Sequence, residues 1–154
     1  MSAELRTFVD IEAPAERVWD VLTDLPAYED WNPFITRAEG TLTVGSRVTF
    51  RLLPVNAFVR PTLRPVVLEL IPCQRLSFRS RMDRLGLLEV EHIVTLTPQD
   101  GGVRLWQDAH FRGLLVRPLI GPLNRARGSA FHAMNTALKE RSEGRQADAP
   151  AAEG

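Results

Sequence analysis

The sequence predicts an α+β fold in which a curved antiparallel β-sheet wraps around a long C-terminal helix. Three observations support this prediction. Only residues 14–30 and 114–142 have apolar residues at helical spacing, and most of the chain between them alternates apolar and polar residues as strands do. The last helix also has one apolar face, which a sheet can cover. We therefore expect a strand, short helices, a run of strands and a closing helix.

Size and composition limit the possible functions. The chain has 154 residues and a mass of 17.3 kDa, which suits one domain. Nineteen basic residues balance nineteen acidic ones, so we expect no nucleic-acid partner. Cys73 is the only cysteine, which fits a reducing cytoplasm. The sequence has neither a signal-peptide pattern nor an apolar stretch of bilayer length. We expect a cytoplasmic protein without stable membrane insertion.

The first strand and helix follow from the N-terminal pattern. Residues 5–11 alternate apolar and polar side chains. Pro14 suits the first position of a helix, and four apolar residues follow at helical spacing, namely Val18, Val21, Leu22 and Leu25. Pro33 keeps the residue before it out of helical geometry, so the chain leaves this corner extended.

Six more strands are predicted, which makes seven in all. The alternating segments are residues 34–41, 47–52, 66–70, 76–82, 88–96 and 103–111. The turn Asp100-Gly101-Gly102 joins the last two strands in a hairpin. Alternation places Phe50, Leu68 and Phe78 on the inner face, where they would line any internal cavity.

The closing helix is expected between Leu114 and Ser142. Pro118, Gly121 and Pro122 would delay its regular part until about Leu123. Residues 143–154 are small and polar and are expected to be a disordered tail, so the folded domain is predicted to span residues 1–142.

Three stretches carry a resemblance to a known family. They are APAERVWDVLTDLPAYEDWNPF near the N-terminus, EHIVTLTPQDGGVRLWQDAHFRGLL, and AFHAMNTALKERSE in the last helix. The chain resembles the SRPBCC or START-like superfamily, and most closely its bacterial polyketide cyclase/dehydrase-type members. The resemblance implies a helix-grip fold, with a seven-stranded sheet around the C-terminal helix and a hydrophobic cavity between them. Members bind lipids, sterols, polyketides or other apolar molecules, and only some are enzymes.

His92 is the most informative single residue. Alternation places it on the inner face with Val90 and Val94. A neutral imidazole there can bond a ligand carbonyl or act as a general base, but most lone buried histidines are held by a neighbouring strand or water, and we favour that interpretation. Gln107 lies on the inward row of the adjoining strand and can pair with His92, with a ligand or within the sheet.

Two further groups of side chains are candidates for ligand contact. Trp31, Asn32 and Phe34 lie at the corner after the first helix, where they either line the mouth of the cavity or pack the helix onto the sheet. The apolar stripe of the last helix consists of Phe131, Met134 and Leu138. We expect these side chains to form part of the core and, secondarily, to contact a ligand. Asn135 lies beside this stripe and must bond either a ligand or the sheet.

Missing motifs exclude several enzyme classes. The sequence has no glycine-rich phosphate loop, nucleophile elbow or HExxH motif, and its histidines have no metal-ligand spacing, so we expect neither a metal nor a cofactor. We favour binding of an apolar small molecule, lipid-like or polyketide-like, by a carrier or sensor. The alternative is a cyclase or dehydratase with His92 as base, although no acidic residue alternates inward beside it. A second alternative is a protein-interaction module that uses residues 114–123.

Overall fold

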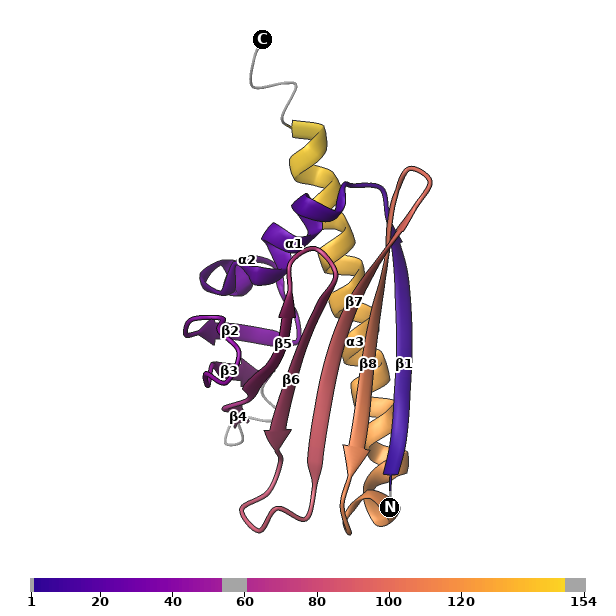
Figure 1. Cartoon of the computed structure of the whole chain (residues 1–154). Helices are drawn as coiled ribbons and strands as arrows, with labels where there is room; N and C mark the ends of the chain where they lie inside the picture. The colour runs from indigo at the N-terminus through magenta and orange to yellow at the C-terminus, as the bar shows by residue number, and fades with distance from the viewer. Residues whose placement is uncertain (1, 54–60, 149–154) are drawn as a thin grey trace.

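The computed structural model describes residues 2–53 and 61–148 (Figure 1). In chain order its elements are β1 (Ser2–Ile11), α1 (Ala15–Thr23), the 3-10 helix η1 (Leu25–Ala27), α2 (Tyr28–Trp31), β2 (Ile35–Glu39), β3 (Thr49–Leu52), β4 (Thr62–Leu63), β5 (Val66–Ile71), β6 (Arg75–Arg81), β7 (Glu89–Gln99), β8 (Gly102–Arg112) and α3 (Val116–Asp148). The predicted α+β architecture is confirmed. The seven expected strands are present, and the two-residue β4 is additional.

The strands form two antiparallel sheets that meet at one edge. The large sheet has the order β1-β8-β7-β6-β5, and the small sheet has the order β2-β3-β4. An isolated bridge between Arg47 and Val66 joins them, together with flanking backbone bonds such as Gly45 N to Val67 O at 2.8 Å. Arg64 and Pro65 separate β4 from β5, because proline cannot donate a ladder hydrogen bond.

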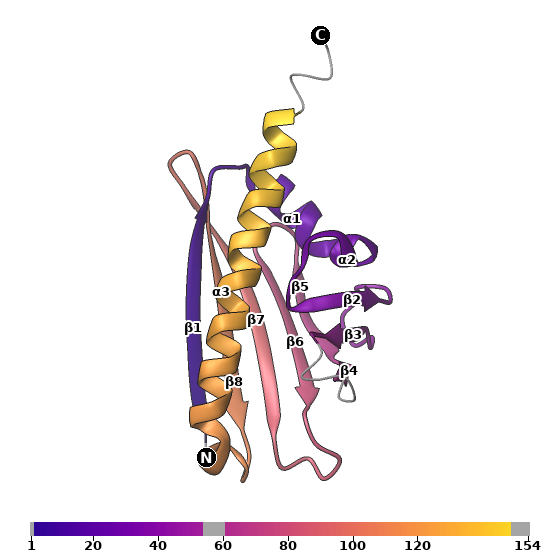
Figure 2. The same ribbon diagram turned by 180° about the vertical axis from the view of Figure 1, so that it is seen from behind.

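Helix α3 lies across one face of the large sheet and covers mainly β1, β8 and β7 (Figure 2). Its buried face carries Phe131, Met134 and Leu138, as the apolar stripe predicts. Near its C-terminal end, Lys139 Nζ donates to the carbonyl oxygen of Asp10 at 3.0 Å. No helix in the described ranges has both the length and the apolar character needed to cross a bilayer.

Both ends of α3 differ from the predicted ones. The helix is continuous from Val116, so the predicted start of its regular part at Leu123 is wrong. Pro118 is tolerated because it lies in the first turn, where a backbone N–H has no helical partner. The helix also continues through Pro122. It also continues to Asp148, beyond the predicted boundary at Ser142. Residues 149–154 lie outside the described residues, so a disordered tail there stays a prediction. The side chain of Leu123 is likewise outside them.

The inward row of β5 is also corrected. Val67 pairs with Phe78 and is fully buried, while Leu68 is only partly buried and lies outside the hydrophobic core. The register shifts between Val67 and Glu69, which places Leu68 in a β-bulge. A bulge inserts one residue and reverses the alternation that follows it. Leu70 therefore packs against the core again, and the predicted inward position of Leu68 is wrong.

Candidate ligand-binding site

The hairpin of β7 and β8 brings the predicted polar residues onto one inner face. The two strands pair in unbroken register from Glu89–Arg112 to Gln99–Gly102, so no bulge alters the alternation. His92 lies opposite Ala109 on β8 and opposite Phe78 on β6. Gln107 is two residues from Ala109 and shares its face, and it is fully buried.

Four side chains form one hydrogen-bonded row, which we call the polar chain: His92, Gln107, Asn135 and Thr7. His92 Nε2 lies 2.8 Å from Gln107 Oε1. Gln107 Nε2 donates to Asn135 Oδ1, and Asn135 Nδ2 donates to Thr7 Oγ1 at 3.1 Å. Thr7 Oγ1 in turn donates to the backbone carbonyl of Gln107 at 3.3 Å. The amides of Gln107 and Asn135 thus bridge the sheet to α3.

The end of the polar chain fixes the direction of every bond in it. A carbonyl oxygen can only accept, so the Thr7 hydroxyl donates there and accepts from the amide nitrogen of Asn135. Asn135 Oδ1 must then accept from Gln107 Nε2, which leaves Gln107 Oε1 to accept from His92. Neutral His92 therefore carries its proton on Nε2.

Sequence reasoning missed Thr7. It lies in the inward row of β1 between Leu5 and Val9, and a polar residue in an apolar row is the same signal that identified Gln107. The signal was present, but the partner was not apparent, because Thr7 and Asn135 are 128 residues apart in the sequence.

Aromatic rings surround the His92 end of the polar chain. The imidazole stacks on Phe131 with ring centroids 4.9 Å apart and planes 19° apart. Phe34 meets Phe131 edge to face at 6.0 Å, and Phe50 meets Phe78 in the same way at 5.1 Å. Phe131 therefore links the corner after α2 to the imidazole on β7.

A small apolar pocket opens beside these rings; we call it the inner pocket. Its lining includes Phe34, Phe50, Phe78, Ser80, Val90 and His92. Its volume is about 20 Å³, which is room for one water molecule. The side chains of the wall fill most of the space between the small sheet, β6 and β7.

Four of the twelve predicted contact residues line the inner pocket, namely Phe34, Phe50, Phe78 and His92. The other eight do not: Trp31, Asn32, Leu68, Gln107, Phe131, Met134, Asn135 and Leu138. Asn32 Oδ1 accepts hydrogen bonds from the backbone N–H groups of Phe34 and Ile35, each at 2.9 Å, so the side chain shapes the corner. Trp31 packs edge to face against Tyr28 at 5.1 Å. The corner thus positions Phe34, which does line the pocket.

The segment considered for protein contact is partly exposed. Leu114 is 77% exposed and Leu119 is 38% exposed, whereas Val116 is buried. Among the residues with described positions, no three His, Cys, Asp or Glu side chains gather as a metal site would require.

Comparison with known proteins places the chain in a family. The sequence profile described as polyketide cyclase / dehydrase and lipid transport matches residues 2–143. The chain belongs to this family. The polyketide cyclase/dehydrase family and its fold are consistent with binding of hydrophobic ligands and with cyclase or dehydrase activity. No curated protein sequence matches the chain.

Solved structures share the fold of this family member. A START superfamily protein from Mycobacterium smegmatis has a TM-score of 0.72 at 18% identity, with 91% of this chain and 97% of that chain covered. Protein MLL2253 from Mesorhizobium loti has a TM-score of 0.66 at 22% identity, with 88% and 96% covered. The di-domain ARO/CYC StfQ of the steffimycin biosynthetic pathway has a TM-score of 0.75 at 14% identity, with 96% and 52% covered. At these identities the similarity shows the helix-grip fold alone.

Proposed function

We propose that the protein binds an apolar small molecule in the inner pocket. The observation that carries this proposal is the composition of the wall, in which aromatic and aliphatic side chains surround His92, the first member of the polar chain. Ligand sites commonly combine an apolar lining with a few fixed polar groups. His92 is held between Phe131 and Gln107 and supplies an oriented polar contact to a ligand that is otherwise apolar.

The ligand makes its own room by moving the small sheet. The inner pocket holds about 20 Å³, so a lipid-like molecule fits only if a wall is displaced. Phe50, Leu52 and Leu63 of the small sheet form one wall. In the described residues, the backbone pairing of this sheet to β5 runs through the Arg47–Val66 bridge and the few bonds beside it. Such a short junction opens at less cost than the long ladder between β7 and β8.

A cyclase or dehydratase with His92 as base is the second candidate. The polar chain favours it in one respect, because it fixes the tautomer of the imidazole as a catalytic base requires. However, the groups of the polar chain are two amides and a hydroxyl, with no carboxylate to stabilise an imidazolium. Binding is therefore the preferred function.

Two measurements test the binding proposal. Native mass spectrometry of protein purified from its host is expected to show a bound apolar molecule, and titration with the neutral dye N-phenyl-1-naphthylamine is expected to show saturable fluorescence. Leu63 lines the inner pocket, so Leu63→Trp is expected to fill it and to abolish dye binding. Leu70→Trp on β5 is the matched control, since Leu70 packs against the core outside this pocket. Protein that carries no ligand and binds no dye would contradict the proposal.

His92→Ala separates the two candidate functions. If the protein is a carrier, the variant stays folded and binds the apolar ligand more weakly. If it is a cyclase, turnover of a polyketide-like substrate is lost in the variant, and unchanged turnover rules out His92 as the base.

A further inference from the structure

A second hollow lies where the two sheets separate. β5 pairs with β6 only as far as Val66 and Arg79, whereas β4 turns away to pair with β3 (Figure 1). Among the described residues, no strand pairs with the end of β6, at Ser80 and Arg81, on that side. A cleft of about 550 Å³ occupies the gap.

Arginine side chains dominate this cleft. Arg47, Arg64, Arg79 and Arg81 line it, and we call it the arginine cleft; Glu89 is the single acid among its described lining residues. The chain as a whole is neutral, with nineteen basic and nineteen acidic residues, so the cleft is a local concentration of positive charge. A concave surface lined with one sign of charge attracts the opposite ion.

Little of this charge is neutralised by ion pairs. Arg47 Nη1 donates to the carbonyl oxygen of Arg64 at 3.2 Å, and that acceptor is uncharged. Arg81 Nε lies 3.5 Å from Glu89 Oε1, and the Arg81 side chain is 73% exposed. Arg79 lies opposite Glu91 on β7, on the outer face of the sheet. Glu89, the acid in the described lining, is thus paired with Arg81, and no ion pair within this described lining joins an acid to Arg47 or Arg64.

The arginine cleft and the inner pocket share part of their walls. Leu63 and Ser80 line both of them. We propose that the arginine cleft binds the anionic head of an amphiphilic ligand, a carboxylate or a phosphate, while the apolar chain of the ligand enters the inner pocket. This inference rests on the proposed binding function and adds the class of ligand. Guanidinium groups suit it, because each can pair both oxygens of a carboxylate or phosphate.

Isothermal titration with probes of equal chain length tests the inference. Decanoate and decyl phosphate are the two anionic probes, 1-decanol is the neutral one, and butyrate and inorganic phosphate are anions without a long chain. Both ten-carbon anions are expected to bind about tenfold more tightly than 1-decanol, and the advantage is expected to shrink in high salt. Butyrate and inorganic phosphate are expected to bind more weakly than decanoate and decyl phosphate. Preference for one ten-carbon anion identifies the head group.

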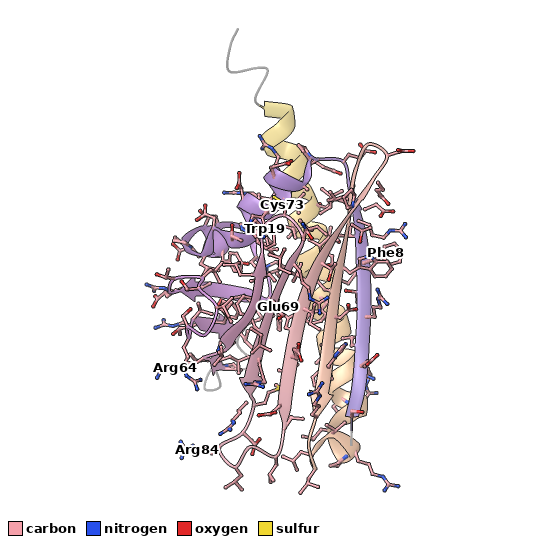
Figure 3. All side chains as sticks on the ribbon, in the orientation of Figure 1. Phe8, Trp19, Arg64, Glu69, Cys73 and Arg84 are labelled. Atoms are coloured by element: carbon pink, nitrogen blue, oxygen red, sulfur yellow. The ribbon has the colours of Figure 1, made fainter. Side chains whose placement is uncertain are left out.

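Charge-removing variants locate the head group. Arg64→Gln and Arg47→Gln are each expected to lower affinity for decanoate about fivefold and to leave affinity for 1-decanol unchanged. Arg84→Gln is the matched control, because Arg84 lies outside the cleft on the turn after β6, as Figure 3 shows. Thermal melting of each variant checks that it is folded.

The outcomes separate the two proposals. The proposed head-group site is contradicted if decanoate and 1-decanol bind with equal affinity, or if Arg84→Gln and Arg64→Gln lose equal affinity for decanoate. Either result leaves the proposal of apolar binding intact. Failure of every ten-carbon probe to bind overturns the proposed function as well.

Discussion

His92 and Gln107 are joined across neighbouring strands, with the imidazole Nε2 2.8 Å from the side-chain oxygen of Gln107. The side-chain amide of Gln107 donates a hydrogen bond to Asn135 on α3, and Asn135 donates one to Thr7 on β1. One row of polar groups, buried at Gln107 and Asn135 and half-buried at its two ends, thus links β7, β8, α3 and β1. Its bonds are directional, because it ends at a carbonyl that can only accept.

Gln107→Leu is expected to destabilise the protein by about 2–4 kcal/mol. The variant loses the hydrogen bonds that the buried Gln107 amide makes with His92 Nε2 and with Asn135 Oδ1. Urea unfolding measures the loss. Gln74→Leu at the exposed turn between β5 and β6 is the control and should change stability by about 0.5 kcal/mol or less. A similar small effect for both variants would show that the polar chain contributes little.

Neutral His92 is expected to hold its proton on Nε2. Long-range ¹H–¹⁵N correlation spectra distinguish the two tautomers of an imidazole. The wild type should show a protonated Nε2 and an unprotonated Nδ1, and Gln107→Leu should lose this preference because the acceptor is gone. A wild-type spectrum with the proton on Nδ1 would reverse the assigned direction of the polar chain.

Phe131→Ala is expected to cost about 3–5 kcal/mol, because the ring is fully buried between His92 and Phe34 and its removal leaves a cavity. Phe8→Ala removes the same ring from the outer face of β1 (Figure 3). Phe8 is 51% exposed there and contacts Trp106. This variant should cost only about 1 kcal/mol. Chemical denaturation compares the two, and equal losses would contradict the assigned core.

The carboxyl group of Glu69 is expected to titrate below its ordinary value of 4.5, because a hydrogen bond from Arg75 Nε at 2.5 Å lowers its pKa. A lowered pKa in the folded state means that this pair stabilises the protein above the ordinary value and that the contribution is lost as pH falls. Both side chains are partly exposed, so the effect on stability is small.

The ¹³C chemical shift of the Glu69 carboxyl group follows this titration. Arg75→Gln should bring the pKa back toward 4.5, and the stability difference from wild type should shrink as the medium is acidified. Arg84→Gln, which removes a charge elsewhere, should leave the titration of Glu69 unchanged. An unshifted midpoint in Arg75→Gln would show that the bond is absent in solution.

The inner face of β7 and β8 was predictable from the sequence. Both strands alternate without interruption, and the turn Asp100-Gly101-Gly102 joins them in a hairpin, so His92 and Gln107 fall on one face as expected. The apolar stripe of α3 was predictable for the same reason, since helical periodicity identifies the face that is buried.

Alternation misled the prediction where the backbone departs from regular geometry. The bulge in β5 exchanges the expected positions of Val67 and Leu68. The break at Arg64 and Pro65 turns β4 toward β3 and opens the arginine cleft. Pro118 and Pro122, which predicted a delayed helix, are accommodated within a continuous α3. The bulge and the break depend on pairing with another strand, which local periodicity does not report.

The sequence by itself determined the α+β class, the order of the elements and the buried rows, because burial on one face imposes a period that can be read along the chain. Only the tertiary structure decided that Thr7 completes the polar chain, that side chains leave the inner pocket about 20 Å³, and that four arginines line a neighbouring cleft. The physical reason is that such contacts depend on strand register, bulges and side-chain packing between residues far apart in sequence.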